Sequence, residues 1–449
     1  MSRLWIAALV ACSATARADG VVIEGGSPRD IGRAGTGTVG DDGGGALLVN
    51  PAAMARRDTK RAQLGVSVID DAIDWQPAEP NTPRARDQAA SDILPLAAAE
   101  GSVCGWILGL GAMTSAAASR TLASPSDLPA NQLANRFEYR YGGIAGSLRR
   151  DTVALGAARR IGEWLAVGAS LAGSRVSVSE TRAVWAGFAG REQIGDPEHD
   201  VDVALSADAP FSPSAVAGVL IAPPDTRLEL AASIAWAAIA RTSGSVTAAG
   251  ASSAVSASVL SPTAKLEVRQ PITVRAGARW VGSRLIGEID GDLWIMPAAA
   301  EAGHWQLGSL RIIDATGVYN DLEDLPSRLS MQTKGAVRAS LDAQLFAGFL
   351  WATAGYAYTT AGTADDRLSP TFGDLGGHTL GLGLEASAGS FTITVGWSRT
   401  WSTRHTVDAT AWKLDNPFLA GDGPVPLGTY DGSRDLVGVS VEGELDAPP

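Results

Sequence analysis

The sequence has little cysteine, few lysines and only 6% aromatic residues, and it shows no long helical periodicity. The few lysines and the lack of helical periodicity, together with 52 glycines, argue against an α/β enzyme and favour a large all-β unit. Of the two cysteines, Cys12 lies in an N-terminal segment that we expect to be removed. The remaining Cys104 cannot form an internal disulfide, and its apolar neighbours predict a small packed side chain.

Catalytic patterns are also scarce. The four histidines fall in predicted loops or at strand ends, and none accompanies the nucleophile motif that serine hydrolysis requires. Asp41 and Asp42 precede three glycines but supply too few ligands for calcium. The net charge of −12 argues against a nucleic-acid partner. We therefore predict a protein that is not an enzyme and that has no metal or cofactor.

The first 18 residues have the features of a secretory signal peptide. Arg3 supplies a positive start, residues 4–11 form a short apolar stretch, and Ala16-Arg17-Ala18 is a small-x-small cleavage site. The apolar stretch is too short to span a bilayer. We predict export and cleavage after Ala18.

A glycine-rich run over residues 32–57 ends in a potential helix start. Asn50 can cap that helix, Pro51 suits its first position, and Ala52 begins a run of about two turns. So short a helix needs a surrounding wall, so we predict an N-terminal plug, or hatch, over residues 19–60. A disordered linker is the first alternative. The second is nucleotide binding, because residues 35–40 match G-x-G-x-x-G, but no strand precedes the match.

From residue 61 to residue 449 the chain alternates with period two, as strands do when their faces meet different solvents. Tight turns alternate with long segments rich in Pro, Asp, Ser and Gly. This arrangement predicts an antiparallel transmembrane β-barrel with long extracellular loops and both ends in the periplasm; a soluble sandwich would have little reason for it. The fourteen predicted strands are 62–71, 92–99, 103–115, 147–160, 163–179, 201–222, 226–240, 270–281, 284–296, 331–345, 348–360, 377–388, 391–405 and 434–445.

One face of the predicted strands carries charges that must be paired or hydrated inside the lumen. Arg275 and Arg279 lie on the strand before Glu288, Asp290 and Asp292, so neighbouring strands can pair them. We interpret these lumen charges as a structural ion-pair lining rather than as a substrate site.

The sequence resembles the FadL family of outer-membrane transporters, which includes the TodX-type aromatic-hydrocarbon channels. The resemblance is carried by GRAGTGTVGDDGGGALLVNPAAMAR with Asn50, Pro51 and Ala52, by FSPSAVAGVLIAPPDTRLELAASIAW, and by the closing GTYDGSRDLVGVSVEGEL. It implies a monomeric, plugged fourteen-stranded barrel in the outer membrane of a Gram-negative bacterium, surrounded by lipid and lipopolysaccharide. The implied function is passive uptake of long-chain fatty acids or aromatic hydrocarbons. Unlike the usual family pattern, this chain does not end on an aromatic residue.

The resemblance also implies a lateral exit through an inward kink of the third strand. Gly105, Gly109 and Gly111 lie there, and glycine inside a strand often marks a bulge or bend. The alternative is that these glycines make room for the plug. Two other functions stay open from sequence, namely a general polar porin and a surface-exposed structural or binding barrel.

Overall fold

The computed structural model describes most of the predicted mature chain. The described residues are 27–41, 43–78, 84–123, 137–187, 195–298, 303–314, 316–346, 348–408, 416–418 and 426–445. The predicted signal peptide and its cleavage site lie outside them. No helix in the described part is long and apolar enough to cross a membrane.

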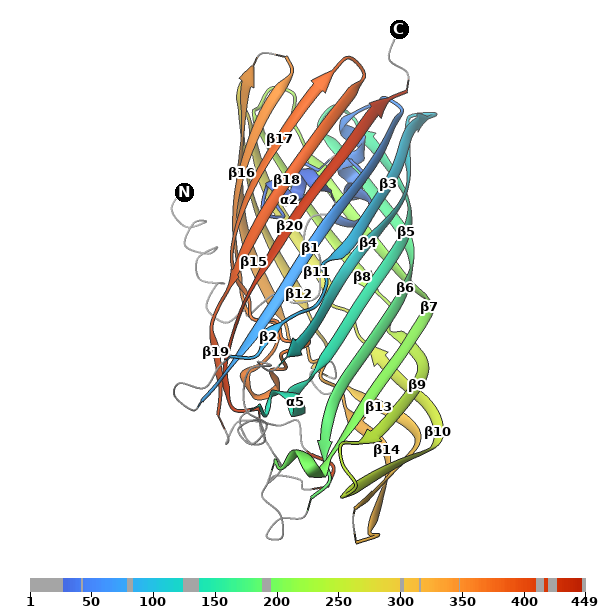
Figure 1. Ribbon diagram of the computed structural model, residues 1–449. Coiled ribbons are helices and arrows are strands. Elements are labelled where there is room, and N and C mark those ends of the chain that lie inside the picture. Colours follow the sequence, from blue (N-terminus) through green and yellow to red (C-terminus); the bar gives the residue numbers. More distant parts are fainter. Residues whose placement is uncertain are drawn as a thin grey trace.

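Fourteen antiparallel strands close into a barrel (Figure 1). Each strand pairs with the next, and the last pairs with the first, from Arg61 opposite Glu444 to Pro77 opposite Gly428. Every one of the fourteen predicted strands is present, which confirms the predicted fold class. In order around the barrel the strands are β1 (Arg61–Pro77), β3 (Asp92–Val103), β4 (Trp106–Ala123), β5 (Ala145–Ile161), β6 (Leu165–Trp185), β7 (Asp200–Ile221), β8 (Leu228–Ala237), β11 (Ile272–Val281), β12 (Leu285–Ile295), β15 (Lys334–Phe346), β16 (Leu350–Thr359), β17 (Gly377–Ala388), β18 (Phe391–Ser402) and β20 (Gly428–Glu444).

The two faces of the wall differ as the period of two requires. On β20, Val437, Val439 and Val441 are exposed on the outer face, whereas Ser440 is buried and Gly438 approaches the interior residue Ile31. An aliphatic outer face and a small or polar inner face are typical of a barrel that separates lipid from a lumen.

The connections are short at the end where β1 begins and long at the opposite end. Cys104 and Gly105 form the two-residue turn between β3 and β4, with φ of 52° and 77°. The prediction of a packed Cys104 is wrong: the side chain is exposed, because β3 ends one residue before it and Cys104 lies in the turn. The long connections contain α5 (Tyr139–Gly142), η2 (Pro197–His199), η4 (Asp365–Arg367) and the short strands β2 (Arg86–Asp87) and β19 (His405–Val407).

Two segments predicted as loops, 241–269 and 297–330, instead contain a four-stranded extension of the wall. Its strands are β9 (Ala240–Gly250), β10 (Val255–Val268), β13 (His304–Asp314) and β14 (Tyr319–Pro326), and they continue the sheet from β7. The first two strands are rich in Ser, Ala and Gly, and Gly and Ala are depleted in strands. They become strands through the shared core that they build with β13 and β14, and strand preference depends on such neighbours.

The N-terminal segment, defined here as residues 27–57, lies inside the barrel (Figure 1). It contains α2 (Pro28–Gly32), α3 (Ala46–Val49) and η1 (Pro51–Arg56). Leu47 and Met54 are almost fully buried and pack in one cluster with small residues of the wall such as Ala154 and Ala158. The barrel wall therefore supplies the core that so short a helix cannot build alone.

Candidate functional site

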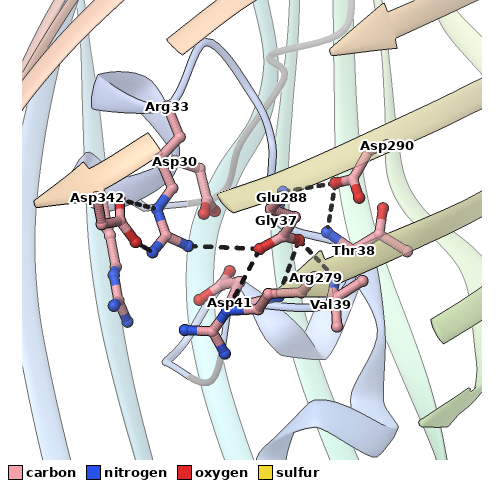
Figure 2. A network of polar contacts seen from close by, with 12 residues as sticks. Asp30, Arg33, Gly37, Thr38, Val39, Asp41, Arg279, Glu288, Asp290 and Asp342 are labelled. Carbon is pink, nitrogen blue, oxygen red and sulfur yellow. Dashed lines mark hydrogen bonds and ion pairs between the residues drawn. The ribbon is translucent and has the colours of Figure 1, made fainter. Parts of the chain in front are cut away.

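Two carboxylates on β12 hold the glycine-rich loop of the N-terminal segment (Figure 2). Asp290 Oδ2 accepts hydrogen bonds from the backbone N–H groups of Gly37 and Thr38, both at 2.8 Å. Glu288 Oε1 accepts from those of Val39 and Gly40, both at 2.9 Å. Consecutive backbone amides thus form a concave anion-binding loop, and its anions are the barrel's own side chains.

The glycines of this loop are required by the close approach. A Cβ on Gly40 would lie 2.3 Å from Glu288 Oε2, and a Cβ on Gly37 would lie 2.8 Å from Asp30 Oδ1. The match of residues 35–40 to a nucleotide motif has the same physical origin, because glycine lets backbone amides approach an anion. Here the carboxylates of the barrel already occupy the amides that a phosphate would need.

Arg33, at the end of α2, adds an ion pair between the N-terminal segment and the wall. Its Nε donates to Asp342 Oδ1 on β15 at 3.1 Å, Nη2 also contacts this carboxylate, and Nη1 lies 3.9 Å from Glu288 Oε2 (Figure 2). Only 1% of the Arg33 side chain is exposed. A charge so deeply buried is tolerated when it is paired, so removal of either carboxylate would leave the guanidinium only partly compensated.

The five predicted lumen charges meet on neighbouring strands. Arg275 Nε lies 3.6 Å from Asp292 Oδ2, and Arg279 Nε lies 3.8 Å from Glu288 Oε2, in both cases between directly opposed residues of β11 and β12. Sequence reasoning missed that Glu288 and Asp290 also bind backbone amides of the N-terminal segment. The lumen charges therefore belong to one network with that segment.

The Asn50-Pro51-Ala52 turn is anchored at a second place in the wall. Asn50 Oδ1 accepts from Ala52 N at 3.2 Å, which is the expected cap, although the helix that follows is a 3-10 helix. Asn50 Nδ2 also donates to Thr38 O at 2.9 Å and to Val219 O of β7 at 3.3 Å. A Cβ on Gly218 of β7 would lie 2.0 Å from Asn50 Oδ1, so the wall is shaped to receive this turn.

A cavity of about 160 Å³ lies between the N-terminal segment and one side of the wall. Thr38, Leu48 and Val49 of the segment line it, and the remaining lining residues come mainly from β4 to β8, β11 and β12. An apolar cavity of about 150 Å³ is enough to bind benzene. The apolar lining residues include Met113, Leu148, Val176, Val216, Trp236, Trp294 and Met331, and the charged ones are Arg150, Arg269, Arg275 and Asp292.

The wall beside this cavity is irregular at Ser115 of β4. The ladder between β4 and β5 shifts between Thr114 and Ala116, which leaves Ser115 as an extra residue, and its hydroxyl lies 2.7 Å from Thr152 Oγ1. The pairing of β3 with β4 extends only from Leu96 to Val103, so residues 92–95 of β3 have no ladder partner in β4. The ladder of the barrel wall is therefore interrupted next to the cavity.

Arg149 of β5 bridges this seam from the outer face. Its Nη1 and Nη2 donate to Ile93 O at 3.2 Å each, and Nη2 donates to Thr114 Oγ1 at 3.0 Å. An outer hollow faces the seam on the other side of the wall, and Met113, Thr114 and Thr152 line both it and the cavity. One layer of side chains thus separates the interior cavity from the outer surface.

The three glycines predicted for a kink lie between this seam and the end of the barrel at the β3–β4 turn. Gly105 is in the β3–β4 turn, whereas Gly109 and Gly111 face the N-terminal segment. A Cβ on either would lie 2.8 Å from Met54 Sδ or Leu47 Cδ1, respectively, and the β4–β5 ladder is regular here. These positions match the alternative that the glycines make room for the segment. The one sequence signal for Ser115 is the break in alternation at Thr114-Ser115.

Within the described part of the chain, no group of three or more His, Cys, Asp or Glu side chains is placed to hold a metal ion. The acidic cluster around Arg33 is used by arginines and backbone amides instead. Asp42, which together with Asp41 supplies too few ligands for a calcium site, lies outside the described residues.

Comparisons with known proteins agree with the resemblance found in the sequence. Residues 9–226 match the family described as "Outer membrane protein transport protein (OMPP1/FadL/TodX)". No curated protein matches the sequence significantly.

Solved structures with the same fold cover nearly the whole chain. A Pseudomonas aeruginosa FadL homologue has 15% identity and a TM-score of 0.74, and covers 95% of this chain and 99% of its own. The P. putida toluene transporter TodX has 15% identity and a TM-score of 0.69, with coverage of 94% and 99%. The Ralstonia pickettii toluene transporter TbuX has 14% identity and a TM-score of 0.64, with coverage of 94% and 98%. The family resemblance and the barrel fold that it implies are thereby confirmed.

Proposed function

We propose, on the premise of this resemblance to the FadL/TodX transporters, that the protein is a channel in the outer membrane of a Gram-negative bacterium. It takes up hydrophobic small molecules passively, such as fatty acids or aromatic hydrocarbons, and it is not an enzyme. Its aliphatic outer face fits a monomer surrounded by outer-membrane lipid and lipopolysaccharide. The N-terminal segment is its hatch.

The observation that carries this proposal is the position of the mainly apolar cavity between the hatch and the seam in the wall. Four amide–carboxylate hydrogen bonds and the ion pairs of Arg33 fix the hatch below the cavity. A polar porin would need an open aqueous lumen, whereas this lumen is filled by buried side chains of the hatch. An apolar ligand in the cavity would meet less resistance at the seam than through the hatch.

We therefore place the lateral exit at Ser115 rather than at the three glycines. A bulge leaves one residue out of the ladder, and here it coincides with the unpaired end of β3. Arg149 closes the seam through polar contacts with Ile93 O and Thr114. Such contacts can exchange as a ligand passes without breaking the rest of the barrel.

The test is uptake by proteoliposomes that contain the purified protein. We expect saturable passage of an alkylbenzene and little swelling in small sugars. Deletion of Ser115 removes the extra residue, restores a regular β4–β5 ladder and should slow alkylbenzene uptake at least several-fold. Deletion of Leu345, the extra residue in the β15–β16 ladder, is the matched control and should leave uptake unchanged.

Swelling in sugars without saturable alkylbenzene uptake would show a polar porin. Normal alkylbenzene uptake by a folded Ser115 deletion would retain the channel and remove the seam as its exit. Heat-modifiable electrophoretic mobility checks that each barrel has folded.

A further inference from the structure

Arg150 of β5 lines the cavity with a positive charge that no carboxylate in the described part of the chain neutralises. Its side chain makes one hydrogen bond, from Nε to Ser174 Oγ at 2.9 Å. The other charged residues of the cavity wall are paired, since Arg269 donates to Glu267 at 2.8 Å and Arg275 lies 3.6 Å from Asp292. Arg338 also binds Asp292. The cavity wall thus carries three arginines against one aspartate.

A chain of hydroxyl groups orients Arg150. Ser174 Oγ lies 2.9 Å from Thr152 Oγ1, which lies 2.7 Å from Ser115 Oγ, and Ser115 Oγ donates to Arg150 O at 3.4 Å. Because Nε of Arg150 donates to Ser174 Oγ, each hydroxyl can donate a hydrogen bond to the next hydroxyl in the chain. The last hydroxyl, that of Ser115, donates to the backbone carbonyl of Arg150. The hydroxyl protons are then used within the wall, and Nη1 and Nη2 of Arg150 keep their donors for a ligand.

A guanidinium with both terminal nitrogens free is matched by a carboxylate, which can accept two parallel hydrogen bonds in one plane. Arg150 is only partly exposed, and a partly buried cation without a partner is costly, so an anion entering the cavity gains more there than at a hydrated surface. We propose that the cavity selects compact amphiphiles that carry one carboxylate, such as aromatic or short-chain acids, with Arg150 binding the carboxylate. This proposal rests on the proposed function and assigns the ligand class of the same cavity.

The size and the lining of the cavity define the rest of the ligand. Its volume of about 160 Å³ is close to the roughly 150 Å³ that holds one benzene ring. Met113, Leu148, Val176 and Trp294 offer apolar surface for that ring. A neutral hydrocarbon could fill the same space but would leave Arg150 without a partner.

The experiment uses the full-length protein in a nonionic detergent and isothermal titration calorimetry. The probes are 3-phenylpropionate, its neutral amide 3-phenylpropanamide, and propylbenzene, which share one carbon skeleton. We expect the wild type to bind the acid at least about tenfold more tightly than the amide, as charge-assisted hydrogen bonds predict. Arg150→Met should abolish this preference while propylbenzene affinity changes by less than about threefold. Arg241→Met removes an 80% exposed side chain on β9 and should change nothing.

Two results would overturn the proposal: a wild type that does not prefer the acid over the amide, or a folded Arg150→Met protein that keeps the preference. The wild-type comparison decides the question even where the variant fails to fold. Proteoliposome uptake separates a failure of the Arg150 proposal from a failure of the proposed channel function. Saturable propylbenzene uptake without an acid preference removes only the role of Arg150, whereas no saturable uptake of either probe removes the channel function itself.

Discussion

The double substitution Glu288→Gln with Asp290→Asn should loosen the hatch without opening the barrel. Both replacements keep the shape and one acceptor oxygen but remove the charge that four backbone amides now meet. Glu288 also faces Arg33 and Arg279 at 3.9 Å and 3.8 Å, so both cations lose a partner. The wall itself should persist, because its ladder hydrogen bonds involve neither side chain.

The size of the effect follows from the count of bonds. A hydrogen bond to a charged group contributes about 1.5–3 kcal/mol and a neutral one about 0.5–1.5 kcal/mol, so each of the four bonds weakens by about 1 kcal/mol. The hatch loop should therefore lose on the order of 4 kcal/mol of local stability. That loss corresponds to nearly a thousandfold faster amide exchange when exchange follows local opening.

Hydrogen–deuterium exchange read by mass spectrometry over residues 37–40 measures this change directly. Leakage of a hydrophilic antibiotic into cells reports whether the loosened hatch still seals. Glu323→Gln, which neutralises an exposed carboxylate on β14, is the matched control. Unchanged exchange of the hatch loop in the folded double variant would refute the view that these two carboxylates hold it.

Three further changes test other parts of the structure. Asn50→Leu removes a cap that typically contributes about 1 kcal/mol, so antibiotic leakage should rise while heat-modifiable mobility stays normal. Gly218→Ala places a Cβ 2.0 Å from Asn50 Oδ1 and should increase exchange at the turn, whereas Gly291→Ala, with nothing within 4 Å, should not. Burial raises the pKa of Glu138, beside α5, from 4.5 to about 7. Its native pKa exceeds the unfolded value, so the α5 loop should lose protection from exchange between about pH 4.5 and 7, and Glu138→Gln should abolish this dependence.

The barrel could be predicted because its signal is local. A strand between lipid and lumen alternates residue by residue, as Val437, Val439 and Val441 do on β20, and each strand shows this without its partners. The extension was missed for the opposite reason. Val246 of β9 and Leu266 of β10 are buried in one core with residues of β6, β7, β13 and β14, which lie elsewhere along the chain.

The site could be predicted only in part, since its residues were visible but their partners were not. The spacing of Arg275, Arg279, Glu288 and Asp292 on two adjacent segments was enough to pair them. The bond from Val39 N to Glu288 joins residues 249 positions apart, and no local pattern marks it. Almost any residue can supply a backbone amide, so the sequence does not show which amides bind a carboxylate. The glycines could be recognised, but not that Glu288 accepts hydrogen bonds from this loop.

The chemistry of the N-terminal segment explains why the exit that we propose lies away from the seal. Glycines bring the hatch backbone close to Glu288 and Asp290, and arginines such as Arg33 neutralise the carboxylates that hold it. An apolar molecule gains nothing from such a layer and would have to separate buried charges to cross it. At the seam it meets the single bulged residue Ser115 and a few polar contacts of Arg149. Under the proposed function, the same barrel can therefore stay closed to polar solutes through its hatch while a ligand of the cavity leaves sideways through its wall.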